Sequence, residues 1–216
     1  MEVLEKNISL DEIYWDREEK ASFIVKNFGV YLAEPLLDIG CDKKQLYFKL
    51  PGSFNYRGLD ISHAADIICD LDRSSVPLRD KTYNTVLCSD VLEHLENIHF
   101  AFSELFRVAR KYVIVSLPNC WCDFKFLIRQ IDQPSGKFYG LPLSPPADRH
   151  RWFFNFLEAR DFLVSQPVAR RKAKTLTIYK YYGARSISYY LGRLMLTRRK
   201  FDNLFVNTLW AVYTLE

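Results

Sequence analysis

Short apolar runs alternate with segments of helical periodicity along most of this chain. Five runs have the length and composition of buried strands, at residues 35–39, 55–60, 65–69, 83–89 and 111–117. Amphipathic helices are expected from about Leu10 to Phe28, with Gly29 as a helix stop, and from Asn97 to Arg110. Because strands alternate with helical or turn segments of crossover length, the pattern predicts an α/β fold with a mostly parallel, doubly wound sheet.

The distribution of apolar residues predicts which strands lie in the middle of the sheet. Residues 85–88 and 112–115 are apolar on both faces, which is typical of central parallel strands covered by helices on each side. Strand-like residues 176–181 and 208–213 flank a helical segment at 188–197. We expect these two late strands to pair antiparallel at one edge of the sheet.

The first strand ends in a turn that is typical of ligand-binding sheets. Asp38 and Gly40 form an Asp-x-Gly sequence directly after an apolar run. Glycine is needed where the backbone turns sharply and approaches a ligand, because a Cβ would clash there. Asp60 ends the next apolar run, 22 positions after Asp38. A carboxylate at this spacing accepts hydrogen bonds from ribose hydroxyls, so the sequence predicts a nucleotide-like cofactor.

The charge of the chain gives little indication of a macromolecular partner. The net charge is +4, and the basic residues are spread out except for clusters at 170–174 and 198–200. Nucleic acid is therefore not expected. The clusters fit a solvated surface, although anionic lipid head groups or a phosphorylated substrate remain alternatives. Because no apolar run approaches 18 residues and the N-terminus lacks signal-peptide features, we expect a cytoplasmic protein without a transmembrane segment.

The five cysteines are interpreted as reduced thiols. Cys41, Cys69 and Cys88 fall in or beside predicted buried strands that are far apart in sequence. Cys120 and Cys122, with His150, offer three zinc ligands, but no second Cys or His pair completes the set. No metal is expected on these grounds.

Several short motifs together resemble the class I S-adenosylmethionine-dependent methyltransferases, specifically the small type 11-like domain. The central motif is Asp-Val-Leu-Glu-His-Leu at 90–95, and the resemblance spans roughly residues 35–165. The other segments that carry it lie at 37–41, 58–62, 69–71, 116–119 and 150–153. The resemblance implies a Rossmann-like sheet of seven strands whose last strand is antiparallel, and it implies S-adenosylmethionine as the cofactor.

The same resemblance implies roles for individual residues. Amides around Gly40 and Cys41 are expected to approach the methionine portion, and Asp60 to bind the ribose. Asp70 is expected to accept a hydrogen bond from the adenine amine, with Leu71 beside the purine. The full cofactor-binding set is Asp38, Gly40, Cys41, Asp60, Ile61, Asp70, Leu71 and Ser89.

The glycine loop departs from the family pattern, because Asp42 and Lys44 stand where further glycines are usual. Asp42 tolerates a left-handed turn at modest cost, and its charge suits a cationic cofactor. If Lys44 belongs to the following helix and points outward, the cofactor site is intact. If it does not, the domain is a noncatalytic scaffold.

Methyl transfer from a sulfonium is an SN2 displacement, which needs alignment and, for a hydroxyl acceptor, a general base. The catalytic candidates are His94, His150 and Asp90. His94 follows Asp90 by four residues and would share its face of a helix. A bracing role for His94 at the strand-to-helix junction, and an exposed loop position for His150, are the structural alternatives. Asn119, after the fifth strand, is a further candidate for orienting the acceptor, or it forms a turn with Pro118.

The expected organisation is a single domain in four segments. They are an N-terminal helical cap (1–34), a cofactor-binding core (35–117), a proline-rich lid or acceptor loop (118–151), and a C-terminal helix with edge strands (152–216). The expected activity is methyl transfer to a small-molecule, saccharide or lipid-linked acceptor, with peripheral membrane contact left open. A cofactor-binding pseudoenzyme and a different nucleotide-binding enzyme are the alternatives.

Overall fold

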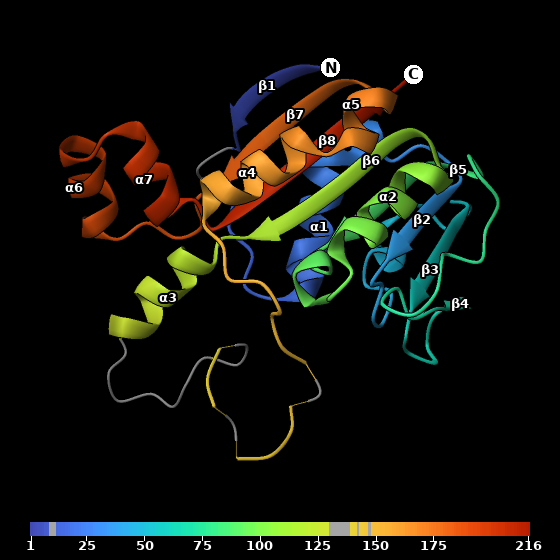
Figure 1. The fold of residues 1–216 in the computed structure, drawn as a ribbon, viewed down its shortest axis with the longest axis horizontal. Helices are drawn as coiled ribbons and strands as arrows, with labels where there is room; N and C mark the ends of the chain where they lie inside the picture. The colour runs from blue at the N-terminus through green and yellow to red at the C-terminus, as the bar shows by residue number, and fades with distance from the viewer. Residues whose placement is uncertain (9–11, 130–138, 142, 147) are drawn as a thin grey trace.

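In the computed structural model, residues 1–8, 12–129, 139–141, 143–146 and 148–216 are described. Eight strands within them form one sheet, in the order β1-β7-β8-β6-β5-β2-β3-β4 (Figure 1). The strands are β1 (Glu2–Asn7), β2 (Leu36–Ile39), β3 (Tyr56–Asp60), β4 (Ile67–Ile68), β5 (Tyr83–Ser89), β6 (Ala109–Pro118), β7 (Ala173–Tyr181) and β8 (Thr208–Leu215). The helices are α1 (Arg17–Phe28), α2 (Ile98–Val108), α3 (Cys120–Arg129), α4 (Phe156–Ser165), α5 (Pro167–Lys172), α6 (Ile187–Met195) and α7 (Arg198–Phe205).

Two predictions about the sheet are confirmed: most strands are parallel, and β5 and β6 are its central strands. β2, β3, β4, β5 and β6 pair in parallel, and only β8 runs antiparallel to its two neighbours, β6 and β7. The strand count is eight instead of seven, because β1 adds to the outer edge of β7 in parallel. Strand β1 falls inside the segment expected to be a helical cap.

The predicted edge position of the last strand is wrong. β8 lies between β6 and β7, and the edge of this half of the sheet is β1. Trp210 and Tyr213 of β8 are completely buried on opposite faces, so this strand needs partners and helices on both sides. β1 has mostly exposed side chains, which suit an edge.

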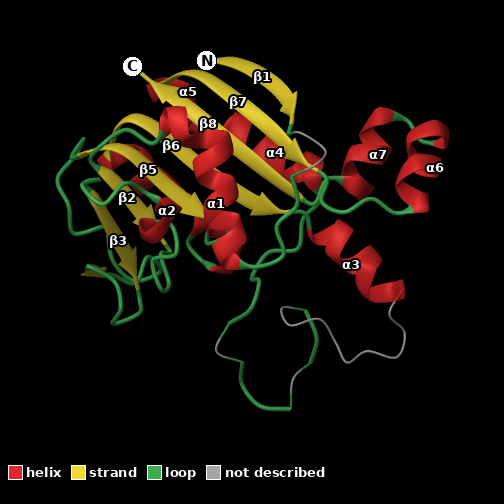
Figure 2. Ribbon diagram, turned by 180° about the vertical axis from the view of Figure 1, so that it is seen from behind, coloured by secondary structure: helices red, strands yellow, loops and turns green. Residues whose placement is uncertain are grey.

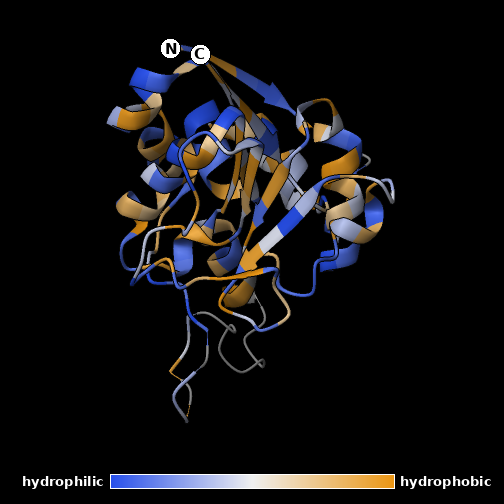
Figure 3. Ribbon diagram, turned by 90° about the vertical axis from the view of Figure 1, so that its right-hand side faces the viewer, coloured by the Kyte–Doolittle hydropathy of each residue, from blue (hydrophilic) through white to orange (hydrophobic). Residues whose placement is uncertain are grey.

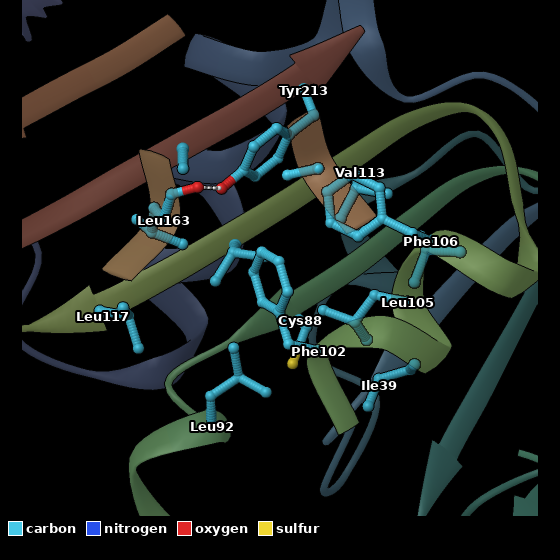
Figure 4. Packing of buried hydrophobic residues seen from close by; sticks show 14 of the residues in the cluster. Ile39, Cys88, Leu92, Phe102, Leu105, Phe106, Val113, Leu117, Leu163 and Tyr213 are labelled. Carbon is cyan, nitrogen blue, oxygen red and sulfur yellow. Dashed lines mark hydrogen bonds between the residues drawn. The ribbon is translucent and has the colours of Figure 1, made fainter. Parts of the chain in front are cut away.

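Helices cover both faces of the sheet. α2, α4 and α5 lie on one face, and α1 lies on the other, as the view from behind shows (Figure 2). Apolar residues are concentrated in the strands between these layers (Figure 3). On the α2 face, Phe102 and Phe106 pack against Tyr213, whose hydroxyl donates to the Leu163 carbonyl at 3.0 Å (Figure 4). On the α1 face, Phe28 packs against Trp210 with ring centroids 5.0 Å apart.

Helix α1 begins at Arg17, later than the periodicity suggested. Asp16 is its N-cap, and the Asp16 carboxylate accepts the backbone N–H of Glu19 at 2.8 Å. An N-cap has extended backbone angles, so the helix cannot continue upstream through it. Residues 9–11 of the expected helix lie outside the described residues.

The C-terminal helices lie beyond the carboxyl ends of β6 and β7, on the same side as α3 (Figure 1). A buried ion pair fixes α7 there, since Lys180 Nζ of β7 lies 2.8 Å from Asp202 Oδ2. The same ammonium lies 2.8 Å from Glu5 Oε2 of β1. α6, by contrast, has no buried residue. None of the described helices is long and apolar enough to cross a membrane.

Candidate active site

A cleft of about 1090 Å³ opens at the carboxyl ends of the parallel strands β2, β3, β5 and β6. This is the edge where open α/β sheets bind ligands. Every site residue predicted from the sequence lines this cleft, although the residues come from segments up to about a hundred positions apart. They are Asp38, Gly40, Cys41, Asp60, Ile61, Asp70, Leu71, Ser89, Asp90, His94 and His150.

Gly40 forms the sharp turn after β2. Its φ is +77°, and a Cβ at this position would lie 2.1 Å from Cγ2 of Val91. Only glycine meets both conditions. The N–H groups of Gly40 and Cys41 donate to the Leu59 carbonyl, at 2.8 and 3.3 Å. These two hydrogen bonds therefore join the turn to β3. Because Gly40 has no side chain, a ligand in the cleft can approach its backbone closely.

The loop after Gly40 closes without the usual further glycines. Asp42 and Lys44 both adopt left-handed angles, with φ of 44° and 57°. The Asp42 amide donates to Asp60 Oδ2 at 2.9 Å, while the Lys44 ammonium pairs with Asp66 Oδ1 at 2.7 Å. Lys44 is not part of the following 3₁₀ turn at Tyr47–Lys49, but its side chain points to Asp66 and it does not line the cleft. Its side chain therefore leaves the cleft open.

Asp60 and Asp70 present carboxylates to the cleft from the ends of β3 and the segment after β4. Asp60 Oδ1 accepts the Ser62 amide at 2.9 Å, and Asp70 Oδ1 accepts the Asp72 amide at 3.0 Å. Backbone donors therefore fix the orientation of both groups. Each carboxylate oxygen has a second lone pair for a ligand donor.

Asp38 lies buried beneath this part of the cleft. Its carboxylate accepts a hydrogen bond from the Tyr56 hydroxyl at 2.7 Å. Burial raises the pKa of Asp38 to about 7, and the charge of Asp60 adds to the increase, against the lowering effects of Tyr56 and Lys20. Asp38 therefore titrates near neutral pH.

Asp90, directly after β5, has a left-handed backbone with φ of 53°. Burial tends to raise its pKa, but the Lys20 ammonium and the Ser116 hydroxyl outweigh this and hold the pKa of Asp90 below its usual value. Lys20 of α1 forms an ion pair with it. An ionised carboxylate with these two partners is a poor proton acceptor, so Asp90 fits an electrostatic role better than that of a base.

The two histidines proposed as catalytic candidates lie together. The rings of His94 and His150 have centroids 4.7 Å apart, although 56 positions separate them in sequence. His94 Nδ1 lies 2.6 Å from Asp148 Oδ1, and His150 Nδ1 lies 2.8 Å from the Tyr139 hydroxyl. The ring of His94 therefore contacts the loop that carries His150, and it joins the 3₁₀ turn Leu92–His94 after β5 to that loop.

Glu93 completes this cluster. It is fully buried, and burial followed by the charge of Asp90 raises its pKa well above the usual value. Glu93, His94 and His150 offer one ligand atom each, all within 4.8 Å of one another, which is an arrangement able to hold a metal ion. All five cysteines are free and buried, and Cys120 Sγ lies 3.7 Å from the Trp152 carbonyl.

Some functional positions were not predicted from the sequence. Lys20 carries no local signal, because it looks like any polar residue on α1, and Tyr139 and Asp148 lie in a segment without periodicity. Asp123 of α3 also lines the cleft, and burial followed by the charge of Asp90 raises its pKa to about 6. Asn119 does not orient a ligand: it is buried, and its amide donates to the backbone carbonyls of Asn203 and Val206.

Comparison with known proteins agrees with this arrangement. Residues 37–116 match a family model described as a methyltransferase domain. The match therefore shows a methyltransferase domain over residues 37–116. The matched segment runs from β2 to β6, so it contains the turn at Gly40, the Asp60 carboxylate and the motif around Asp90. S-adenosylmethionine is the cofactor of this enzyme class. No curated protein matches the sequence.

Solved structures share the fold of this chain at low sequence identity. A SAM-dependent methyltransferase from Archaeoglobus fulgidus is 16% identical, with 93% of this chain and 95% of that chain covered and a TM-score of 0.54. The methyltransferase domain of a bacterial Hen1 is 20% identical, with coverage of 92% and 97% and a TM-score of 0.56. The small RNA methyltransferase HEN1 is 13% identical over 98% of this chain and 27% of that one, with a TM-score of 0.59.

Proposed function

We propose that this chain transfers a methyl group from S-adenosylmethionine to a hydroxyl of a small-molecule or saccharide acceptor. The observation that carries the proposal is one cleft with two chemically distinct ends. The cofactor side consists of Asp38, Gly40, Asp60 and Asp70, and the acceptor side consists of Glu93, His94, Asp148 and His150.

The donor set of the cofactor side fits S-adenosylmethionine. Asp60 is placed to accept hydrogen bonds from ribose hydroxyls, and Asp70 from the exocyclic amine of adenine. The bare turn at Gly40 admits a ligand where a Cβ would not fit. When bound, this cofactor supplies an electrophilic methyl group on a cationic sulfur. Of the carboxylates at this end, Asp42 is paired with Arg17 and Asp90 with Lys20, so the charge that suits the cation comes mainly from Asp60.

The acceptor side supplies groups that orient a hydroxyl and take its proton. His94 and His150 are held in place by Asp148 and Tyr139. An imidazole at this position accepts the proton of the acceptor as the methyl group moves. Alignment of the two ligands in one cleft accounts for the rest of the rate enhancement.

An RNA hydroxyl is the second candidate acceptor. The observation that favours it is that two of the similar structures are the Hen1 methyltransferases, one named for small RNA. The expectation of no nucleic-acid partner therefore lacks support. Arg149 and Arg151 line the same cleft and suit a phosphate-bearing acceptor of either kind.

Calorimetric titration with S-adenosylmethionine and S-adenosylhomocysteine tests the cofactor side. Wild type should bind both, and Asp60→Ala should lose about 10- to 100-fold in affinity, because charge-assisted hydrogen bonds to the ribose are lost. Asp161→Ala removes an exposed carboxylate outside the cleft and should bind like wild type. Absence of binding to the folded wild-type protein would overturn the proposal.

An acceptor screen with isotopically labelled methyl donor tests the transfer itself. The panel contains sugars and sugar nucleotides, phenols and catechols, and short RNA with a free terminal ribose. Label in the first two groups supports the proposed acceptor class, while label in RNA alone would replace it with the second candidate. Tight cofactor binding without transfer to any member would favour the pseudoenzyme alternative.

A further inference from the structure

Glu93 is a buried carboxylate without a hydrogen-bonding partner for its side chain. Its exposed fraction is 0%, and neither Oε1 nor Oε2 has a hydrogen-bond partner among the described residues. A buried carboxylate normally has a charged or hydrogen-bonding partner, because burying it alone costs several kcal/mol. The nearest cationic candidate is His94, whose Nε2 lies 3.9 Å from Oε1. That distance is too long for a hydrogen bond.

The two histidines beside Glu93 are oriented by groups outside the cluster. Asp148 holds His94 at Nδ1, and the Tyr139 hydroxyl holds His150 at Nδ1. The carboxylate of Asp148 fixes the tautomer of His94 and makes its other nitrogen a better ligand, and the Tyr139 hydroxyl fixes the ring plane of His150. Metal-binding histidines usually have such an oxygen at the ring nitrogen that does not bind the metal. Both histidines have one, although they lie on segments 56 positions apart.

The spacing of the three groups matches a single cation. Ligand oxygens and nitrogens lie about 2.0–2.3 Å from a divalent ion, so two ligands of one ion are at most about 4.6 Å apart. In the apo cluster the three ligand atoms lie within 4.8 Å of one another. Closing this difference needs only small rotations of the side chains.

The charged groups around the cluster also favour a bound cation. Asp90, Glu93 and Asp148 bring three carboxylates to this end of the cleft, and Lys20 is paired with Asp90. Asp148 lies against His94, which leaves Glu93 as the carboxylate that a divalent cation would ligate directly, in place of its proton. Two imidazoles and one carboxylate are a donor set that favours first-row transition metals over Mg²⁺, which prefers oxygen alone.

We propose that Glu93, His94 and His150 bind one divalent transition-metal ion, such as Mn²⁺, Co²⁺ or Zn²⁺, which holds the acceptor hydroxyl beside the methyl donor. This differs from the expectation of no metal, which considered only the cysteines with His150. The ion-binding site stands on the cluster alone, whereas its role rests on the function proposed above.

With both imidazoles bound to the ion, neither acts as the base, and the ion would instead lower the pKa of the acceptor hydroxyl. The hydroxyl proton leaves to water, and an oxygen lone pair forms the new C–O bond as the C–S bond breaks. The electron pair of that C–S bond stays on sulfur, which becomes neutral. No oxidant, reductant or further reactant is needed.

Metal titration of the 216-residue chain tests the site. The protein is treated with a chelator, dialysed, and titrated calorimetrically with Mn²⁺, Co²⁺, Zn²⁺ and Mg²⁺, and Co²⁺ absorption spectra report ligation by nitrogen. We expect one transition-metal ion per chain and weaker binding of Mg²⁺. Glu93→Gln and His150→Ala should each weaken binding by about 100-fold or more, whereas Tyr139→Phe should cost about 10-fold, as for an outer-shell partner.

Matched controls separate the cluster from nearby groups. Glu96→Gln removes an exposed carboxylate at the same cleft, and His99→Gln removes a histidine of α2 outside it. Both should bind metal like wild type. Circular dichroism checks the folding of each variant, and His150→Ala, in a loop, keeps the test decisive if Glu93→Gln fails to fold. Absence of stoichiometric binding to wild type, or equal binding by His150→Ala, would overturn the site.

The same samples distinguish a failure of the site from a failure of the proposed function. Binding of S-adenosylmethionine without metal would refute the metal site and leave methyl transfer standing. Binding of metal without S-adenosylmethionine would refute the function and leave the site. Once an acceptor is found, chelation should abolish transfer to it and Mn²⁺ or Co²⁺ should restore it, while cofactor affinity changes little. Transfer that survives complete metal removal would refute the role given to the ion.

Discussion

The cofactor side of the cleft is made from the ends of neighbouring parallel strands, whereas the acceptor side is assembled from segments far apart in the chain. On the cofactor side, backbone amides orient Asp60 and the turn at Gly40 is packed against Val91. On the acceptor side, contacts between side chains hold His94 and His150. The first side is therefore determined mainly by backbone geometry, and the second by a network of side chains.

This difference determines how each side should respond to substitution. The backbone of the turn at Gly40 leaves no space for a side chain, so the methyl group of an alanine there is expected to disrupt the cofactor side. A network of side chains near solvent tolerates substitution of the surrounding residues, provided that the side chains that form its contacts are kept. The cofactor side should therefore depend most on glycine, and the acceptor side on a few polar groups.

Gly40→Ala is expected to have the largest effect. The added Cβ would lie 2.1 Å from Val91 Cγ2, at a φ of +77° that disfavours a side chain. Strain and overpacking together should lower the free energy of unfolding by about 2–4 kcal/mol. Affinity for S-adenosylmethionine should fall by about 10-fold or more because the turn shifts. Urea unfolding and calorimetry measure the two quantities.

Gly52→Ala is the matched control for this substitution. A Cβ at Gly52 meets no atom within 4 Å. Its free energy of unfolding should stay within about 0.5 kcal/mol of wild type, with unchanged cofactor affinity. If both glycine variants behave alike, the cofactor side does not depend on backbone geometry as argued.

The same contrast explains what the sequence could reveal. Gly40, Asp60 and Asp90 belong to short motifs, where one local rule about turns or strand ends places each residue. The parallel strands were predictable because they are short apolar runs. The position of β8 was not, because strand order depends on the burial of Trp210 and Tyr213 by partners that are remote in sequence.

The acceptor side was predictable only as a set of candidates. His94 and His150 were both named, but nothing local indicates that their rings lie 4.7 Å apart. Glu93 was not among the candidates, because its burial without a hydrogen-bond partner becomes evident only in three dimensions. Lys20 was missed because its partner, Asp90, lies 70 positions away. Such contacts depend on the assembled sheet and helices, for which the sequence gives no local rule.

Measuring the free energy of unfolding as a function of pH tests two carboxyl groups of the cleft whose pKa values are raised. Burial raises the pKa of Asp38 from 3.8 to about 7, so the folded state holds a proton that the unfolded chain releases. Stability is therefore highest below pH 4 for this group and falls as pH rises toward 7, by about 1.4 kcal/mol per unit at most. Asp38→Asn should remove this slope between about pH 5 and pH 7 in urea unfolding.

Asp123 of α3, which also lines the cleft, provides the comparison for Asp38. Its pKa is raised from 3.8 to only about 6, so its contribution to the slope has the same sign but ends at a lower pH. Asp123→Asn should flatten the curve below about pH 6 and leave the slope above it unchanged. A wild-type curve that is flat between about pH 5 and pH 7 would contradict both assignments.

The smallest effect is expected on α6, none of whose residues lines the cleft. Leu194 and Met195 are 84% and 80% exposed, so replacing both with serine should change the free energy of unfolding by less than about 0.5 kcal/mol. Cofactor affinity should also be unchanged, because neither residue lines the cleft. The exposed apolar side chains lie beside Arg198, Arg199 and Lys200 of α7, a composition that suits anionic lipid. Sedimentation with anionic vesicles is the informative measurement for this variant. Loss of vesicle binding with stability intact would assign α6 to membrane contact, and binding equal to that of wild type would refute this role.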